Sequence, residues 1–84
     1  MKGMPHHNEH AARVRQLGRF QKDTMRSKQI AKGIRIIIGK LKPKGKSMVT
    51  QAYRFRKDVW TPAQARKWLR EHQIQIISFD PAKE

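Results

Sequence analysis

Two stretches in the middle of the chain have the hydrophobic pattern of β-strands. Residues 34–38 read Ile-Arg-Ile-Ile-Ile, and β-branched side chains of this kind pack well on a pleated surface. Residues 47–56 place Val49, Tyr53 and Phe55 on one side of an extended chain. Between the two stretches, one proline, two glycines and four lysines indicate a turn. The pattern therefore predicts a β-hairpin with a basic tip.

The best-defined helix follows this hairpin. Thr61-Pro62-Ala63-Gln64 has the form of a capping box, in which the Thr61 hydroxyl accepts a hydrogen bond from the Gln64 amide. Pro62 suits the first helical position because no N–H is needed there. We expect Trp60 to pack over the first turn. The next residues have the spacing of a buried helical stripe. The members of this stripe are Ala65, Trp68, Leu69 and His72.

The two ends of the chain are less regular. Residues 1–7 predict a disordered N-terminus, because nothing apolar recurs there at the period of a helix or strand. Asn8 as an N-cap and Gly18 as a stop delimit a short predicted helix over residues 9–17. Residues 19–32 have no clean period and predict an irregular or partly helical basic connector. At the other end, residues 74–79 predict a third strand.

These elements predict an α+β fold. The expected core is a small antiparallel or mixed three-stranded sheet, built from the hairpin, the helix and the last strand, with the helix packed on one face. A short N-terminal helix precedes it. The expected organisation is a disordered segment over 1–7, a basic helix and connector over 8–33, and a ββαβ core over 34–84. Together they make a single domain, because 84 residues suffice for one small domain only.

The charge of the chain is high and uneven. Twenty lysines and arginines against six acidic residues give a net charge of +14. Residues 10–46 alone hold twelve of these cations and one acid, Asp23. Such a concentration of like charge opposes compaction and favours a polyanionic partner, of which nucleic acid is the commonest inside cells. The chain has no cysteine and no apolar run long enough for a membrane span, so we expect a soluble cytoplasmic protein with no membrane partner.

The candidate nucleic-acid-binding residues are the cations of the first half and one from the second strand. Arginines can clamp phosphates, and lysines at the hairpin tip can reach into a groove as point charges. Phe20 and Tyr53 are the aromatic residues least committed to the core and could stack on a base, but for Tyr53 we favour packing in the core or at its rim. No motif of sequence-specific recognition is present. The candidate cations are Arg13, Arg15, Arg19, Lys22, Arg26, Lys28, Lys32, Arg35, Lys40, Lys42, Lys44, Lys46 and Arg54.

Signals for metal binding and catalysis are weak. His6, His7 and His10 form the pattern H-H-x-x-H, but Glu9 is the one further ligand nearby and no second cluster completes a site. The other acidic residues are scattered, and no phosphate-binding glycine-rich loop occurs. We therefore expect no metal, no cofactor and no enzymatic activity.

Three segments carry a family resemblance. Residues 8–13, residues 53–69 and residues 77–82 resemble small proteins encoded in tailed-phage and prophage genomes. Within the second, the pattern W-T-x3-A-x2-W-L from Trp60 to Leu69 also resembles part of phage head-maturation proteins of the prohead protease-like kind. The resemblance implies a phage or prophage origin. None of the matched residues corresponds to a protease triad.

Charge and resemblance together favour one hypothesis over two others. The first is a non-enzymatic, phage-derived basic protein that binds DNA or RNA through phosphates, as an accessory factor in head assembly or genome handling. The alternative is a small phage inhibitor of a host defence nucleoprotein, similar to an anti-CRISPR, that acts by protein–protein contact. A third is a scaffold or minor capsid component. Each hypothesis places the protein in the cytoplasm of a bacterial host or in the virion. The sequence leaves the oligomeric state open.

Overall fold

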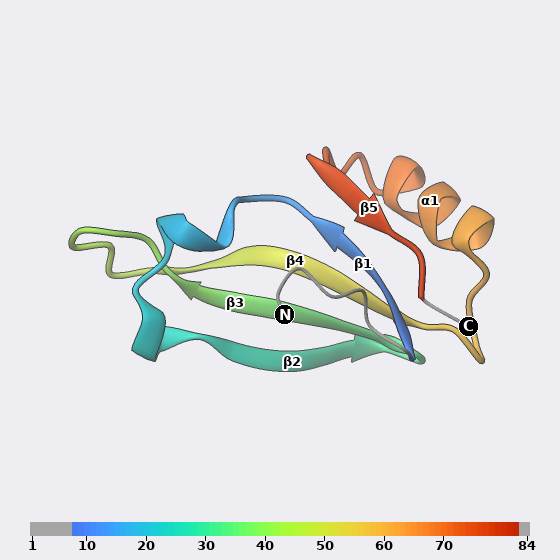
Figure 1. Ribbon diagram of the computed structural model, residues 1–84, viewed down its shortest axis with the longest axis horizontal. Helices are drawn as coiled ribbons and strands as arrows, with labels where there is room; N and C mark the ends of the chain where they lie inside the picture. Colours follow the sequence, from blue (N-terminus) through green and yellow to red (C-terminus); the bar gives the residue numbers. More distant parts are fainter. Residues whose placement is uncertain (1–7, 83–84) are drawn as a thin grey trace.

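The computed structural model describes residues 8–82, which form one antiparallel five-stranded sheet and one α-helix (Figure 1). Two short 3-10 helices, η1 and η2, lie between the first two strands. The elements in chain order are β1 Glu9–Arg13, η1 Leu17–Arg19, η2 Lys22–Thr24, β2 Arg26–Ala31, β3 Ile34–Lys40, β4 Met48–Arg56, α1 Pro62–Glu71 and β5 Ser78–Asp80.

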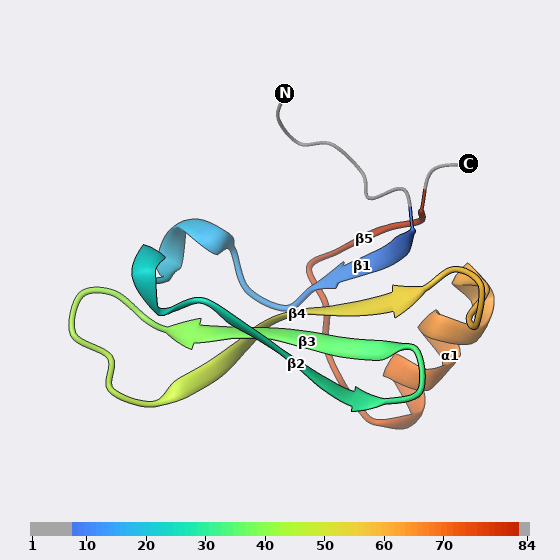
Figure 2. The ribbon, with the colours of Figure 1, turned by 90° about the horizontal axis from the view of Figure 1, so that it is seen from below.

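The strand order brings the two ends of the chain together. It runs β2-β3-β4-β1-β5, so that the first strand lies between β4 and β5. On one side Glu9 pairs with Arg56 and Arg13 with Ala52, and on the other side Ala12 pairs with Phe79. The central strands therefore have hydrogen-bonded neighbours on both sides, whereas β2 and β5 are the edges (Figure 2).

The predicted helix over residues 9–17 is wrong, because this segment begins with β1. The segment has few large apolar side chains, and Leu17, which a helix would have buried, is 53% exposed. As a strand, the segment pairs its backbone N–H and C=O groups with β4 on one side and β5 on the other. It also buries His10, Ala11 and Ala12. Pairing with distant strands thus outweighs the local N-cap signal at Asn8.

The sheet also has more strands than expected. The segment 19–32, predicted as a connector, contains β2. Because β1 and β2 join the three predicted strands, the sheet has five. All six residues of β2 are exposed. An edge strand that buries no side chain has no apolar alternation, which is why its sequence lacked a strand period. The last strand, predicted over 74–79, is found at Ser78–Asp80.

The hairpin and the helix agree with expectation. β3 and β4 pair antiparallel, with a bulge where Ile37 is followed by Ile38. The capping box of α1 is present: the Thr61 hydroxyl accepts from the Gln64 amide at 3.1 Å, and the Gln64 side chain accepts from the Thr61 amide at 2.9 Å. The helix therefore begins where the sequence indicated.

The core lies between α1 and one face of the sheet. Phe55 and Ile34 are its largest fully buried side chains, and Ala65 and Leu69 cover them from the helix. The fourth member of the predicted stripe, His72, is exposed, because the helix ends at Glu71. Its ring instead stacks on Trp68, with the centroids 3.8 Å apart.

His10 joins three separate parts of the chain. Its side chain is buried, its Nδ1 accepts a hydrogen bond from the Ala82 amide at 2.9 Å, and its Nε2 lies 2.7 Å from the Trp60 carbonyl oxygen. Because Nδ1 accepts, Nε2 carries the proton and donates to Trp60. The ring therefore holds β1, the connection into α1 and the segment after β5 together.

Gly33 tests the packing of the β2–β3 turn against the connection between β4 and α1. It has a φ of +71°, and an added Cβ would lie 2.9 Å from the Cβ of Val59 and 3.1 Å from Cδ1 of Trp60. We expect Gly33→Ala to lower the free energy of unfolding by about 2 kcal/mol or more, from backbone strain and overpacking. Urea denaturation followed by circular dichroism measures it.

Gly18→Ala is the matched control, because a Cβ at Gly18 meets nothing within 4 Å. Its stability should stay within about 0.5 kcal/mol of the wild type. Equal stability of the two variants would contradict the close packing of the β2–β3 turn against Val59 and Trp60.

Candidate nucleic-acid interface

The structure divides the candidate cations into separate groups. One group, the arginine cluster, lies on the face of the sheet opposite α1. A second group, the basic end, lies where the β3–β4 loop meets η1 and η2. A third lines the exposed edge strand β2 and the turn after it. The members are Arg13, Arg35 and Arg54 in the arginine cluster, Arg19, Lys22, Lys40, Lys42, Lys44 and Lys46 in the basic end, and Arg26, Lys28 and Lys32 along β2.

Arg15 belongs to none of these groups. Its side chain is partly buried, and Nη1 donates to the Thr50 carbonyl oxygen at 2.7 Å. The backbone amides of Val14 and Arg15 both bond to the Gln51 carbonyl oxygen, and the Gln51 side chain donates to the Arg15 carbonyl at 3.1 Å. Arg15 therefore fastens the chain after β1 to β4.

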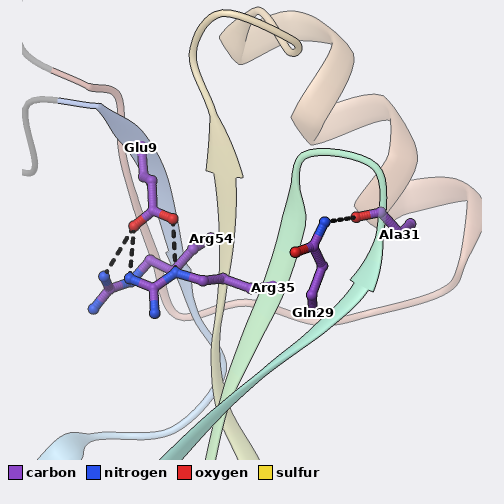
Figure 3. A network of polar contacts seen from close by, with 5 residues as sticks. All are labelled: Glu9, Gln29, Ala31, Arg35 and Arg54. Carbon is purple, nitrogen blue, oxygen red and sulfur yellow. Dashed lines mark hydrogen bonds and ion pairs between the residues drawn. The ribbon is translucent and has the colours of Figure 1, made fainter.

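The arginine cluster forms around one carboxylate. In the sheet register Arg35 lies opposite Arg54, and these positions alternate with the core residues Ile34 and Phe55. Glu9 reaches over from β1: its Oε2 accepts from Arg35 Nε at 2.7 Å and its Oε1 from Arg35 Nη2 at 2.9 Å (Figure 3). Arg54 Nη1 lies 3.5 Å from Oε1.

The pKa values in this cluster follow from these contacts. The hydrogen bonds from Arg35 hold the pKa of the Glu9 carboxyl below its usual value of 4.5, an effect that burial opposes and the charges of Arg35 and Arg54 reinforce. The same hydrogen bonds raise the pKa of Arg35. Burial instead lowers the pKa of Arg54, which has the longer contact with Glu9. Both guanidinium groups remain charged at neutral pH.

The cluster is mainly an ion-pair network of the sheet. The Glu9 side chain is 15% exposed and that of Arg54 18% exposed, so neither presents much charge to a ligand. The Arg54 Nε is buried without a hydrogen-bond partner among the described residues. Arg13 is exposed, and its charge contributes to lowering the pKa of Arg54. Arg13 is thus the most accessible cation of the three.

The basic end is built by hydrogen bonds between distant segments. The Lys42 amide donates to the Arg19 carbonyl oxygen at 2.8 Å, and the Gln21 amide donates to the Lys40 carbonyl oxygen at 2.8 Å. The Gln21 side chain donates to the carbonyl oxygens of Leu41 and Gly45, at 2.8 and 3.1 Å. These bonds hold the lysine-rich β3–β4 loop against the segment that carries η1 and η2.

The basic end is exposed and strongly positive. It lies at one end of the molecule, and α1 lies at the other (Figures 1 and 2). Residues 16–25 and 40–47 contain one acid, Asp23, against six cations. Five of the six cations are exposed, and Lys40 is partly exposed. This arrangement can contact several phosphates of one polyanion at once.

Of the two aromatic residues considered for base stacking, Phe20 is placed differently from expectation, whereas Tyr53 packs as favoured. Phe20 is 2% exposed and lies with Met25 over Gly39, so its predicted availability for a base is wrong. Tyr53 is partly buried and its ring lies 5.8 Å from that of Trp68, between centroids. Both rings contribute to packing.

Residues 8–82 show no group of three or more side chains that could hold a metal ion. His6 and His7 lie outside the described residues, and both ring nitrogens of His10 are engaged by Trp60 and Ala82. In the same part of the chain, no helix combines the length and apolar character needed to cross a bilayer.

Two residues that shape these surfaces were not among the candidates. Glu9, considered from the sequence as a further ligand beside the histidines, binds Arg35, which lies 26 positions along the chain. Gln21 fixes the β3–β4 loop from 20 and 24 positions away. No local pattern marks either residue, because each role depends on strand pairing that brings distant segments together.

Comparison with known proteins identifies no relationship: no family model, no curated protein and no solved structure matches the chain.

The ion pairs of Glu9 predict a pH dependence of stability. Because folding lowers the pKa of Glu9, its contribution is fully present above pH 4.5 and is lost as the pH falls through the lowered value. We expect the difference in unfolding free energy between wild type and Glu9→Gln to be constant above about pH 5 and to shrink below it. Urea denaturation at a series of pH values measures this difference.

The control is Glu71→Gln, which removes an exposed carboxylate 3.9 Å from Lys67. Such a surface pair contributes little, so this variant should remain within about 0.5 kcal/mol of wild type at neutral pH. A difference for Glu9→Gln that stays constant down to about pH 3 would show that its ion pairs do not stabilise the fold.

Proposed function

We propose that this protein is a non-enzymatic nucleic-acid-binding protein that contacts phosphates through its basic end. The observation that carries the proposal is the docking of the β3–β4 loop on Arg19 and Gln21, which gathers six cations around one acid. Like charges held so close repel one another, and a phosphate backbone relieves that repulsion. Binding of a polyanion therefore stabilises the folded protein.

The chemistry of the basic end favours backbone contact over base readout. Five of its six cations are lysines, which act as hydrated point charges on flexible stems. Hydrogen bonds within the protein already employ the Gln21 amide, a group that could otherwise bind a base edge. A contact of this type positions the protein on nucleic acid without selecting a sequence.

The phage-like segments suggest the setting. A small basic protein of phage or prophage origin that holds phosphates suits an accessory role in genome handling or head assembly in the cytoplasm of a bacterial host. The matched residues Trp60, Thr61, Ala65 and Leu69 form the cap and core of α1, so they support the fold of such a protein more than its binding surface.

Salt dependence tests the proposal. With six phosphates neutralised, the logarithm of the binding constant should fall with the logarithm of salt concentration at a slope of about −5 on duplex DNA and about −4 on a single strand. Fluorescence anisotropy of a labelled oligonucleotide gives the slope. Binding that is independent of salt would refute phosphate contact.

Single substitutions locate the surface. Lys42→Gln, Lys44→Gln and Lys46→Gln should each reduce the magnitude of the slope by about 1, since each removes one phosphate contact. Arg70→Gln, an exposed cation on α1 at the far end of the molecule, should leave it unchanged. Equal effects of the loop and helix variants would mean that net charge, and not the basic end, determines binding.

A lysate experiment separates nucleic acid from a protein partner. The proposal predicts that material captured by the protein is lost after nuclease treatment. A partner that survives the nuclease would favour the inhibitor hypothesis instead.

A further inference from the structure

Both tryptophans of the chain line one groove beside α1. The groove has a volume of about 360 Å³, within the range of small-ligand sites. One tryptophan, Trp60, comes from the connection between β4 and α1, and the other, Trp68, from the second turn of the helix. The lining residues are Val59, Trp60, Gln64, Lys67, Trp68 and Glu71.

The two indole rings are held firmly. Trp60 and Trp68 each meet Phe55 edge-on, with centroids 5.6 and 5.8 Å apart, and His72 stacks on Trp68. Trp60 Nε1 also donates to the Lys32 carbonyl oxygen at 3.0 Å. Rigid aromatic surfaces lose little conformational entropy when a flat ligand stacks on them.

A line of cations connects this groove with the basic end. β2 starts directly after η2 at Arg26 and runs along the edge of the sheet to the turn at Lys32, where the carbonyl binds Trp60 (Figures 1 and 2). Arg26, Lys28 and Lys32 are all exposed. The six residues of β2 cover about 20 Å, a distance over which an extended single strand presents several phosphates.

We propose that the protein binds single-stranded nucleic acid, which follows β2 from the basic end and stacks a base in the tryptophan groove. This inference rests on the proposed function. The bases of a duplex are stacked on each other, whereas those of a single strand are free to stack on aromatic side chains. Lys67 at the rim supplies a contact for the adjoining phosphate, since its 3.9 Å pair with Glu71 is exposed and weak.

Tryptophan fluorescence reports on the groove directly, because the chain has two tryptophans and both line it. The probe is a single strand of 15 thymidine nucleotides. The reference is an abasic strand with the same number of phosphates. Both should bind, as measured by anisotropy of an end label, but we expect the thymidine strand alone to quench the tryptophan emission.

Gln64→Glu tests the groove without removing the cap, because glutamate also completes a capping box. It places a negative charge in the groove and should weaken binding of the thymidine strand about fivefold, the loss expected when one base is no longer stacked. Ala63→Glu is the matched control: it adds the same charge to the same turn, at an exposed position that does not line the groove. It should change the affinity little and preserve the quenching.

The outcomes separate this inference from the proposed function. Equal affinity for both strands without quenching would overturn the groove assignment and leave phosphate binding intact. Quenching by a proline-rich peptide, with none by the thymidine strand, would also overturn it and assign the groove to a protein ligand. Failure of both strands and of duplex DNA to bind at low salt would refute the proposed function itself.

Discussion

The constraint that dominates this structure is repulsion among its cations. Twenty lysines and arginines face six acids within 84 residues, so compaction brings like charges together. The fold reduces the repulsion in two ways. Where positive charge lies on the central strands, Glu9 lies between Arg35 and Arg54. Elsewhere the cations are placed on loops and the sheet edge, where water and salt screen them.

Local signals were sufficient for the parts of the fold that are stabilised locally. The capping box at Thr61 and the isoleucines of β3 identified α1 and the hairpin, because helix caps and alternating β-branched residues act over a few positions. They failed for β1 and β2. β1 has only small apolar residues and is stabilised by partners from β4 and β5, and β2 lies at an edge without a buried side.

For the candidate site too, local sequence was informative and contacts between distant segments were not predicted. Composition correctly indicated where along the chain the positive charge is concentrated, but not which cations share a surface. The grouping depends on contacts such as Gln21 with Leu41 and Glu9 with Arg35, which span 20 and 26 positions. The sequence assigned the tryptophans mainly to folding. Their contacts with Phe55 agree with that role, while the groove they line is visible only in three dimensions.

The position of β1 in the sheet has a consequence for how the chain reaches its native state. Glu9 and Arg54 are 45 positions apart, and His10 and Ala82 are 72 apart, so β1 is synthesised well before either of the strands with which it pairs. During synthesis β2, β3 and β4 can pair with one another as a meander, because they follow each other along the chain. β1 at that stage lacks its second partner, β5. Topologies dominated by such distant pairings fold slowly, because the entropy of closing long loops is lost before the contacts form. The β1–β5 pairing, which involves the last strand of the described chain, can therefore form only after the other four strands have been made.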